Sequence, residues 1–391
     1  MSGITRSYDL GRRLVDLGHE VHIVTSWREP IKRRDWFTTN EDGIHVHWLP
    51  NLYSNNMSYP RRMRSFASFA LRSAQKVVQL RSDVIYATSS PLTIAVPALI
   101  ARSVTKAPLV FEVRDSWPKV PIAVGALRNP VLILLARRLE RAAYFGSSHV
   151  VALAPGMRED VVRTGYSPKR VSVIPNGCDL SLFRRSNQIE SQNELLTTYP
   201  WIMERPLIVY VGTIGIVNNV EYIVNLAHAL KKFGSPANFA ILGDGKERKK
   251  TEGLAHELGV NGDAVHFIGQ VPKSEIPKWL AASVASIMTY GGPKSVYQDS
   301  VSNKFFDSLA AARPVYANFK GYSTQIAEEW NAGKILPREV DRAADELSQS
   351  IRSGWPFAAS SNALRLGEVR FSRDQQAKEL EQILQSVVQQ N

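Results

Sequence analysis

Short apolar runs alternate with helical stretches along most of the chain, and this alternation predicts two α/β domains. In the first half, β-rich runs occupy 21–25, 84–87, 109–113, 149–152 and 171–175, with helical patterns such as 5–17 and 129–144 between them. In the second half, predicted strands lie at 207–212, 238–242, 264–268, 285–288 and 314–317, again separated by helical stretches. Strands that alternate with helices are typical of parallel, doubly wound sheets covered by helices.

The alternation breaks at residues 184–206, which are polar and read as an irregular linker flanked by a short helix. The prediction is therefore an N-terminal domain over 1–185 and a C-terminal domain over 206–370. The last segment, 371–391, is predicted as an amphipathic helix, and its return to the N-terminal domain is left open. Open α/β sheets bind ligands beyond the carboxyl ends of their strands, so a cleft between two facing domains is the expected active site.

Composition changes this picture little. The chain has 391 residues, 44% of them hydrophobic and 21% charged, which suits two ordinary hydrophobic cores. Cys178 is the one cysteine, so no internal disulfide forms, as expected in a reducing compartment. No secretory signal opens the sequence, and no apolar run reaches the ~18 residues that a membrane span needs. A cytoplasmic protein is predicted.

The charge is uneven. Of the net charge of +12, residues 1–190 hold 27 Lys and Arg against 15 Asp and Glu, whereas the remainder holds 21 of each. A basic first half attracts acidic lipid headgroups, phosphorylated substrates or nucleic acid, although a merely solvated face has the same composition. Nucleic-acid binding would rest on charge alone, because no recognised motif supports it, and it is not predicted.

Two glycine turns follow predicted strands of the second half, one at 210–215 and the other at 241–246. Glycine lets the backbone approach a phosphate closely, and a helix that follows contributes partial positive charge. Tight structural turns explain the same pattern about as well. The residues assigned to nucleotide binding from this part of the chain are Gly212, Thr213, Gly215, Asn219, Gly243, Gly245 and Val271.

The segment 299–307 carries the strongest chemical signal. Ser302 and Asn303 open a predicted helix, and Lys304 lies in its first turn, where a cation opposes the helix dipole. Such a conflict marks a site that holds an anion. Asp307 lies one turn later on the same face, where it is able to accept hydrogen bonds from ribose hydroxyls. The alternative is a solvated polar face on an ordinary helix.

In the first half, the segment 111–118 places charged residues at the carboxyl end of an apolar strand. Asp115 is a candidate base or orienting group for an acceptor hydroxyl, and Trp117 offers a flat face for a sugar ring. Glu112 and Arg114 complete the candidate acceptor site, or they form a structural ion pair. The eight histidines show no ligand spacing, so neither a metal nor a cofactor is predicted.

Taken in order, these segments resemble glycosyltransferase family 4, whose members are retaining enzymes with the GT-B fold of two Rossmann-like domains. The similarity is greatest to the bacterial branch that builds O-antigen, capsule or colanic-acid-like polysaccharides and includes L-fucosamine transferases. It covers nearly the whole chain. The segments that carry it are 3–6 with 17–21, 111–118, 175–177, 210–215, 242–245 and 303–307 with Pro314.

The resemblance assigns roles to these residues. The family's Glu-x7-Glu donor motif falls on Asp299 and Asp307, which would hold the donor sugar and the ribose. Lys304 and the helix start at Ser302 and Asn303 would hold the diphosphate. The family's Arg and Lys after the first glycine are replaced here by Thr213 and Asn218–Asn219. The predicted catalytic residues are Asp115, Asp299 and Lys304, and the predicted acceptor residues are Gly3, Arg6, Glu112, Arg114 and Trp117.

Family members begin with a strand before the first glycine loop, whereas this sequence begins at the loop. Either the start lies upstream, or the N-terminal domain lacks its first, central strand. Loss of that strand would expose apolar neighbours and unpaired backbone groups, so poor stability is expected.

The resulting prediction is metal-independent transfer of a hexosyl or N-acetylhexosaminyl group from a nucleotide sugar, most simply a UDP-sugar. The acceptor would be a lipid-diphosphate-linked saccharide at the inner face of the cell membrane, in the synthesis of a surface polysaccharide. Basic, apolar-interleaved stretches at 61–72 and 131–141 are candidates for docking on the membrane, or are helices packed on the sheet. Two alternatives are a nucleotide-sugar epimerase of similar fold and a truncated, non-catalytic binding subunit.

Overall fold

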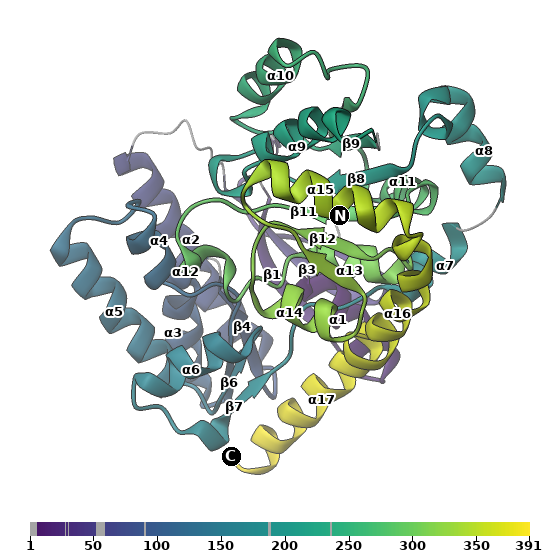
Figure 1. Ribbon diagram of the computed structural model, residues 1–391. Coiled ribbons are helices and arrows are strands. Elements are labelled where there is room, and N and C mark those ends of the chain that lie inside the picture. The colour runs from purple at the N-terminus through teal and green to yellow at the C-terminus, as the bar shows by residue number, and fades with distance from the viewer. Residues whose placement is uncertain are drawn as a thin grey trace. The chain divides into compact units, whose positions relative to one another are not determined.

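The computed structural model describes residues 6–27, 29, 31–51, 59–89, 91–186, 189–234 and 237–391. The chain divides into two compact units (Figure 1). Unit 1 comprises Met1–Pro175 with Asp374–Asn391, and unit 2 comprises Asn176–Arg373. The chain therefore passes from unit 1 to unit 2 before residue 185, and the C-terminal helix belongs with unit 1.

The larger sheet of unit 1 is parallel throughout, with the strand order β4-β5-β6-β7. All five residues of β5 are buried, which is typical of a parallel strand covered on both faces. Its strands are β4 (Ile85–Thr88), β5 (Leu109–Val113), β6 (His149–Ala152) and β7 (Val171–Val173). Helical segments between them are η1 (Leu92–Ile94), α3 (Ala95–Thr105), α4 (Lys119–Ala123), α5 (Pro130–Phe145), α6 (Pro155–Arg163) and η2 (Pro168–Arg170).

A smaller sheet of unit 1 has the order β1-β3-β2 and contains strands β1 (His22–Trp27), β2 (Phe37–Glu41) and β3 (Ile44–Pro50). Strands β2 and β3 form an antiparallel hairpin that the sequence prediction omits. Asp42 and Gly43 turn it with φ angles of 51° and 84°, the left-handed pair that a tight hairpin needs. The Asp-Gly pair between alternating apolar residues was the available signal.

Helix α1 (Arg6–Asp16) packs against both sheets of unit 1. Leu10 lies in a cluster with Val110 and Val151 of the larger sheet, whereas Val15 packs against the cluster of the smaller sheet. Helix α17 (Arg373–Gln389) joins the first cluster through Leu380. In the part of the chain that the structure describes, no strand pairs with the outer edges of β1 and β4, so the sheets remain separate.

Helix α2 (Tyr59–Leu80) contains the stretch 61–72 that the sequence suggested as a docking surface. The helix packs on α3 and β1, which agrees with the alternative of a helix covering the sheet. Its residues 61–63 have side chains outside the described set, and Leu71 is exposed.

Unit 2 holds one six-stranded sheet, with order β10-β9-β8-β11-β12-β13, and every neighbouring pair is parallel. Strands β9 and β10 lie on one side of β8, and strands β11 to β13 lie on the other side. The point between β8 and β11 is therefore the topological switch, where open α/β sheets bind ligands. The strands are β8 (Leu207–Val211), β9 (Asn238–Leu242), β10 (Val265–Gly269), β11 (Ala285–Met288), β12 (Val315–Ala317) and β13 (Gly333–Ile335).

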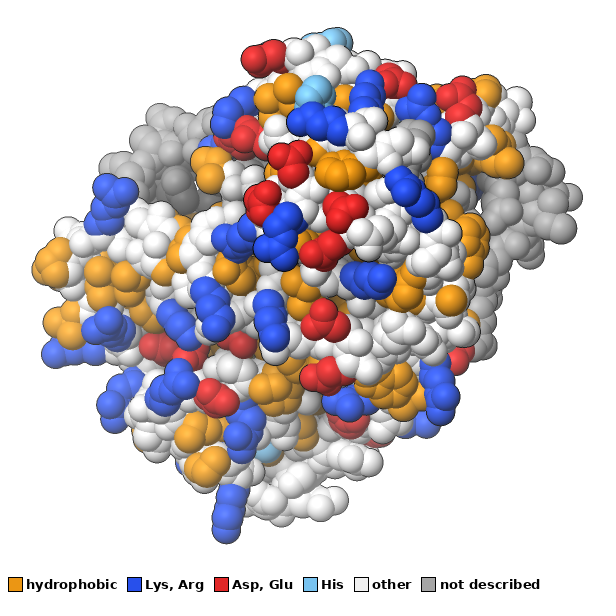
Figure 2. Space-filling view, viewed as in Figure 1, with side chains coloured by type: hydrophobic (Ala, Val, Ile, Leu, Met, Phe, Trp, Pro, Cys, Tyr) orange, Lys and Arg blue, Asp and Glu red, His pale blue; other side chains and the backbone are white. Residues whose placement is uncertain are grey.

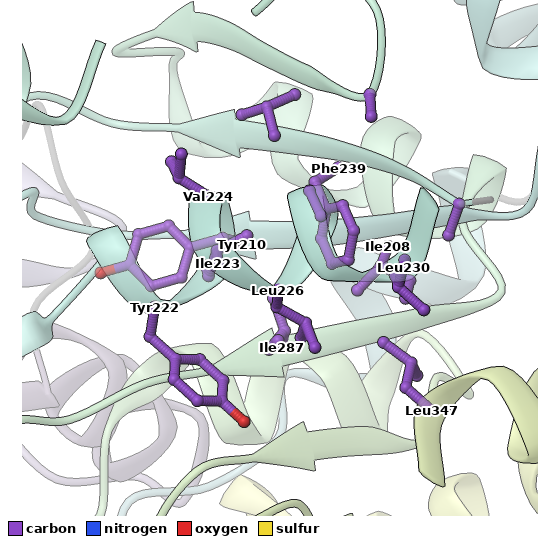
Figure 3. Packing of buried hydrophobic residues seen from close by; sticks show 14 of the residues in the cluster. Ile208, Tyr210, Tyr222, Ile223, Val224, Leu226, Leu230, Phe239, Ile287 and Leu347 are labelled. Atoms are coloured by element: carbon purple, nitrogen blue, oxygen red, sulfur yellow. The ribbon is translucent and has the colours of Figure 1, made fainter. Parts of the chain in front are cut away.

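The helices of unit 2 cover both faces of this sheet, and their apolar sides form its core. Figure 3 shows Leu226 and Leu230 of α9 packed near Ile208 and Phe239 of the sheet, with Tyr222 of the same helix in the same core. The helical segments are α7 (Leu180–Ser186), α8 (Ile189–Thr198), η3 (Pro200–Met203), η4 (Ile216–Asn218), α9 (Glu221–Lys232), α10 (Arg248–Glu257), η5 (Lys273–Glu275), α11 (Ile276–Ala282), α12 (Lys294–Tyr297), α13 (Asn303–Ala310), α14 (Tyr322–Glu329), α15 (Val340–Arg352) and α16 (Trp355–Arg370).

The prediction of an irregular linker at 184–206 is wrong, because α8 and η3 occupy most of it. Leu195 and Ile202 are buried, and the Trp201 ring stacks on His266 with centroids 3.6 Å apart. A few apolar anchors thus order a segment whose composition is polar. Among the described helices, none is both long and apolar enough to cross a bilayer.

Histidine packing in the small sheet of unit 1 predicts acid sensitivity. Burial, with Lys76, His22 and His45 nearby, lowers the pKa of His47 to about 4. Between the ordinary histidine pKa of 6.5 and about 4, the unfolded chain then binds more protons than the folded one, so stability falls as the pH falls. We expect His47→Gln to reduce this loss, measured by urea unfolding across the window. Exposed His256→Gln is the control, and an unchanged pH slope in His47→Gln would contradict the assignment.

Candidate functional site

The candidate site lies in unit 2 at the carboxyl ends of β8, β9 and β11, beside the start of α13. It is built from two glycine loops, 212–215 and 243–247, which join through backbone hydrogen bonds. The Gly212 N–H donates to Leu242 O at 2.9 Å, and the Ile214 N–H donates to Asp244 O at 3.0 Å. The loops therefore form one surface at the topological switch of the sheet.

The glycines are required by the close approach of the two loops. A Cβ atom on Gly243 would lie 1.9 Å from Gly212 O, and one on Gly245 would lie 2.2 Å from Ile214 O. Gly212 and Gly243 also have φ angles of 148° and 147°, which side chains rarely tolerate. This geometry explains the glycines structurally, and their contact with a nucleotide stays a prediction.

Lys304 leaves the first turn of α13 and reaches the glycine surface. Its Nζ lies 4.5 Å from the ring centroid of Tyr210 and 5.6 Å from that of Tyr290. The same atom is 3.3 Å from Tyr210 Oη, and it would be 3.3 Å from a Cβ on Gly212. The ammonium group thus sits between two aromatic rings, over the loop that ends β8. Tyr210 and Tyr290 are site residues to which the sequence prediction gave no role, although Tyr210 opens the first glycine motif.

The electrostatics of this lysine are unfavourable in the unliganded protein. Burial lowers the pKa of Lys304 to about 8, and no carboxylate of the described residues offsets this shift. The helix dipole opposes a cation in this position, and the two aromatic faces compensate only in part. A bound anion would restore the charge balance. In the first turn of α13, the Phe305 N–H donates to Ser302 O at 3.0 Å. Helix geometry gives the amides of Asn303 and Lys304 no partner within the helix, and they would bind the same anion.

Asp307 lies one turn along α13 from Asn303 and is only 4% exposed. Its charge, after burial, raises the pKa of the buried Cys178 thiol. The segment that contains Cys178 supports the start of α13, because Asn176 Nδ2 donates to Val301 O at 2.7 Å. The sequence placed this Asn-Gly turn at the end of the first domain, and the structure shows that it supports the loop before α13 in unit 2.

The other predicted donor residues differ in exposure. Thr213 and Asn303 are exposed, whereas Asp299 is half-buried and its carboxylate accepts a hydrogen bond from Gln298 Nε2 at 3.1 Å. Asn219 adopts a left-handed φ of 47°. The structure places half-buried Gly215, Val271 and Ser302 in the loops after β8, after β10 and before α13.

In unit 1, Arg6 and Glu112 form a buried ion pair. Arg6 Nε lies 2.7 Å from Glu112 Oε1, and the Glu112 side chain is fully buried. Hydroxyl groups of Tyr86 and Thr88 also donate to this carboxylate, and Arg6 donates to Ile174 O and Pro175 O. Burial raises the pKa of Glu112, but the charge of Arg6 and the hydrogen bonds outweigh it and hold the pKa below its ordinary value.

Two residues that the sequence assigned to the acceptor site, Arg6 and Glu112, are instead buried in this ion pair. Glu112 pairs with Arg6, not with Arg114, and neither group of the pair faces solvent. Asp115 is exposed, and Arg114 and Trp117 are half-buried, in the loop after β5, so the contact of these three residues with an acceptor stays a prediction. Gly3 lies outside the described residues. Among the described residues, no group of three His, Cys, Asp or Glu is placed to hold a metal ion.

Two family models match the chain in tandem. The model described as "Glycosyl transferase 4-like domain" matches residues 3–177, and "Glycosyl transferases group 1" matches residues 191–352. Together they cover most of the sequence, and they meet close to the division between the two units.

Curated relatives match over shorter stretches. An alpha-D-kanosaminyltransferase of Streptomyces kanamyceticus is 24% identical over 204 residues, which are 52% of this chain and 50% of the relative. An alpha-maltose-1-phosphate synthase of Mycolicibacterium smegmatis is 32% identical over 92 residues, or 23% of this chain and 24% of the relative. The matched stretches thus span half or less of these relatives.

Solved structures are similar over nearly the whole chain. HepE of Anabaena, in complex with UDP, has a TM-score of 0.71 at 16% identity and covers 94% of this chain and 100% of its own. Sucrose-phosphate synthase of Thermosynechococcus elongatus has a TM-score of 0.77 at 15% identity, covering 98% and 93%. At these identities the likeness shows the fold, and it confirms the predicted GT-B class with two Rossmann-like domains. The cleft between the domains stays a prediction.

The buried charge of Lys304 predicts a gain in stability on its removal. Because its pKa is lowered from 10.5 to about 8, the folded protein binds fewer protons than the unfolded chain between these values, and stability rises with pH through that window. We expect Lys304→Met to stabilise the unliganded protein at neutral pH by about 1–3 kcal/mol and to flatten this rise. Denaturant unfolding measures both effects. Exposed Lys378→Met is the control, and a destabilised Lys304→Met would refute the argument.

Removal of one partner of the Arg6–Glu112 pair should destabilise the protein, whereas Lys304→Met should stabilise it. Glu112→Gln removes the carboxylate that pairs with the buried Arg6 guanidinium, which we expect to lower the free energy of unfolding by about 3–5 kcal/mol. The exposed Glu159→Gln should change it by under about 1 kcal/mol. Thermal unfolding of both variants measures this difference, and a Glu112→Gln variant as stable as the parent protein would return Glu112 to the list of candidate acceptor residues.

Proposed function

The chain belongs to family 4 of the glycosyltransferases, and from this premise we propose that it transfers a sugar from a UDP-sugar to a lipid-linked saccharide. The transfer would retain the anomeric configuration, without a metal ion, as the family resemblance implies. The acceptor would belong to a cell-surface polysaccharide such as O-antigen, capsule or exopolysaccharide. The L-fucosamine-transferase branch is the proposed relationship within the family.

The observation that carries this proposal is the Lys304 ammonium group, half-buried over Gly212 with no carboxylate of the described residues to balance it. A nucleoside diphosphate would supply the missing negative charge. As the bond from the sugar to the diphosphate breaks, charge builds on the leaving phosphate, and Lys304 with the α13 amides would stabilise it. The lysine is thereby more favourable in the transition state than in the empty protein.

The proposal that the nucleotide is UDP rests on the fold similarity. HepE of Anabaena is described in complex with UDP and with UDP-glucose, and its fold covers nearly all of this chain. By the family resemblance, Asp307 would accept hydrogen bonds from the ribose, and Asp299 would contact the donor sugar. Asp115, exposed at the carboxyl end of β5, would orient the acceptor hydroxyl.

The surface of α5 supports a membrane-bound acceptor. Val131, Leu134 and Leu135 are 62%, 51% and 53% exposed, and Arg138 and Arg141 are exposed on the same helix. Figure 2 shows hydrophobic and basic side chains side by side near the left edge of the view, where Figure 1 labels α5. Apolar side chains flanked by arginines are suited to the headgroup region of an anionic bilayer. We propose a peripheral location at the cytoplasmic face of the membrane.

UDP binding tests the donor site. We expect UDP to raise the melting temperature of the parent protein, and Lys304→Met to weaken UDP binding about 10- to 100-fold, as the loss of a buried charge-assisted contact would. Because free Lys304 is partly deprotonated near pH 8, binding at that pH should take up protons. Calorimetry in buffers of different ionisation enthalpy measures the uptake.

Two further variants sharpen this test. Asp307→Asn keeps the shape of the buried side chain but removes its charge, and it should weaken UDP binding without abolishing proton uptake. Lys378→Met, on the exposed side of α17, should bind UDP like the parent protein. Equal UDP affinity in the parent protein and Lys304→Met would refute the proposed donor site.

A further inference from the structure

Unit 1 contains a cavity of about 510 Å³, lined by residues of α4, α5 and α6 and by the loop after β5. Its volume lies in the range of small-molecule sites. Ser116 lines it directly beside Asp115 in sequence, so the cavity begins at the carboxyl end of β5. None of the residues predicted for the acceptor site lines it.

The inner wall combines apolar and hydrogen-bonding groups. Val113, Met157 and Tyr144 are each less than 7% exposed and form its apolar side. Tyr144 Oη donates to Glu140 Oε1 at 3.2 Å. Burial raises the pKa of Glu140 to about 7, so near neutral pH this carboxyl both donates and accepts hydrogen bonds.

The remaining charges are largely paired and lie nearer the mouth. Asp160 accepts from Lys119 Nζ at 2.7 Å and from Arg163 Nη1 at 2.9 Å. Arg137 is exposed on α5 and completes the rim. An anionic ligand would meet the carboxyl groups of Glu140 and Asp160, and a cationic ligand would meet the basic side chains of Lys119, Arg137 and Arg163. A purely apolar ligand would bury these polar groups without hydrogen bonds.

We propose that this cavity binds an uncharged pyranose ring of the acceptor saccharide. The inference rests on the proposed transferase function and specifies its acceptor subsite. A pyranose presents hydroxyl groups that both donate and accept, and apolar C–H faces that match Val113 and Met157. A ring held here lies next to the loop that carries Asp115. The lipid attached to such a saccharide would extend along α5, whose Arg137 belongs to the rim.

Methyl NMR of the six methionines tests the cavity, because Met157 lines it and Met288 lies at the end of β11 in unit 2. The signals are assigned with Met157→Leu and Met288→Leu. The probes are methyl β-glucoside and N-acetylglucosamine as neutral sugars, glucuronate and inorganic phosphate as anions, and UDP. We expect the neutral sugars to shift the Met157 signal saturably and UDP to leave it unchanged.

Ala123→Trp fills the cavity from α4 without removing a charge, and it should reduce the sugar-dependent shift at least tenfold. Ala142→Trp, on an exposed position of α5, is the matched control and should respond like the parent protein. Tyr144→Phe should weaken sugar binding and leave UDP affinity unchanged. Preserved chemical shifts elsewhere in unit 1 establish that each variant is folded.

The outcomes separate the two proposals. No Met157 response to neutral sugars, or a response to glucuronate or phosphate instead, overturns the sugar subsite. A sugar response that survives in Ala123→Trp overturns it as well. UDP binding that persists through these outcomes leaves the donor site standing. A sugar response without any UDP binding would overturn the proposed UDP donor site and show that the cavity binds sugars independently of it.

Discussion

The donor site depends on one unfavourable interaction, the burial of a lysine ammonium group at the positive end of a helix. Lys304 lies over the Gly212 loop between two tyrosine rings, with a pKa lowered to about 8. The fold tolerates this arrangement because the six-stranded sheet and its covering helices fix both α13 and the two glycine loops. Binding of a diphosphate would relieve this unfavourable free energy. The attraction between Lys304 and the diphosphate would then grow as negative charge develops on the leaving phosphate.

The two units differ in how their buried charges are balanced. In unit 1, Arg6 and Glu112 neutralise each other, and both are satisfied by neighbouring hydroxyl and carbonyl groups. This pair ties the start of α1 to β5 and to the end of the larger sheet, in a unit whose two sheets do not join within the described residues. In unit 2, no carboxylate of the described residues balances the charge of Lys304. A paired charge stabilises a fold, whereas an unbalanced one in a glycine-lined loop is suited to an anionic ligand.

Much of the fold followed from local patterns. Alternating strands and helices predicted the four strands of the larger sheet of unit 1 and five of the six strands of the sheet of unit 2. The Asp-Gly pair at 42–43 contained the signal for the hairpin that was missed. The supposed linker at 184–206 was misjudged because the few side chains that order it, among them Trp201 stacked on His266, act through contacts distant in sequence. The alternative of a Glu112–Arg114 ion pair failed for the same reason, since the partner of Glu112 is Arg6, 106 residues away.

By itself, the sequence determined the α/β class, the order of the motifs and the conflict between Lys304 and its helix dipole, because strand runs, glycine turns and helix starts are local properties. Only the tertiary structure decided that this lysine reaches Tyr210 and Tyr290, that Asn176 supports the loop before α13, and that a cavity opens beside Glu140. Those features are distances between residues far apart in the chain. Such distances are set by how sheets and helices pack, and a linear pattern does not contain them.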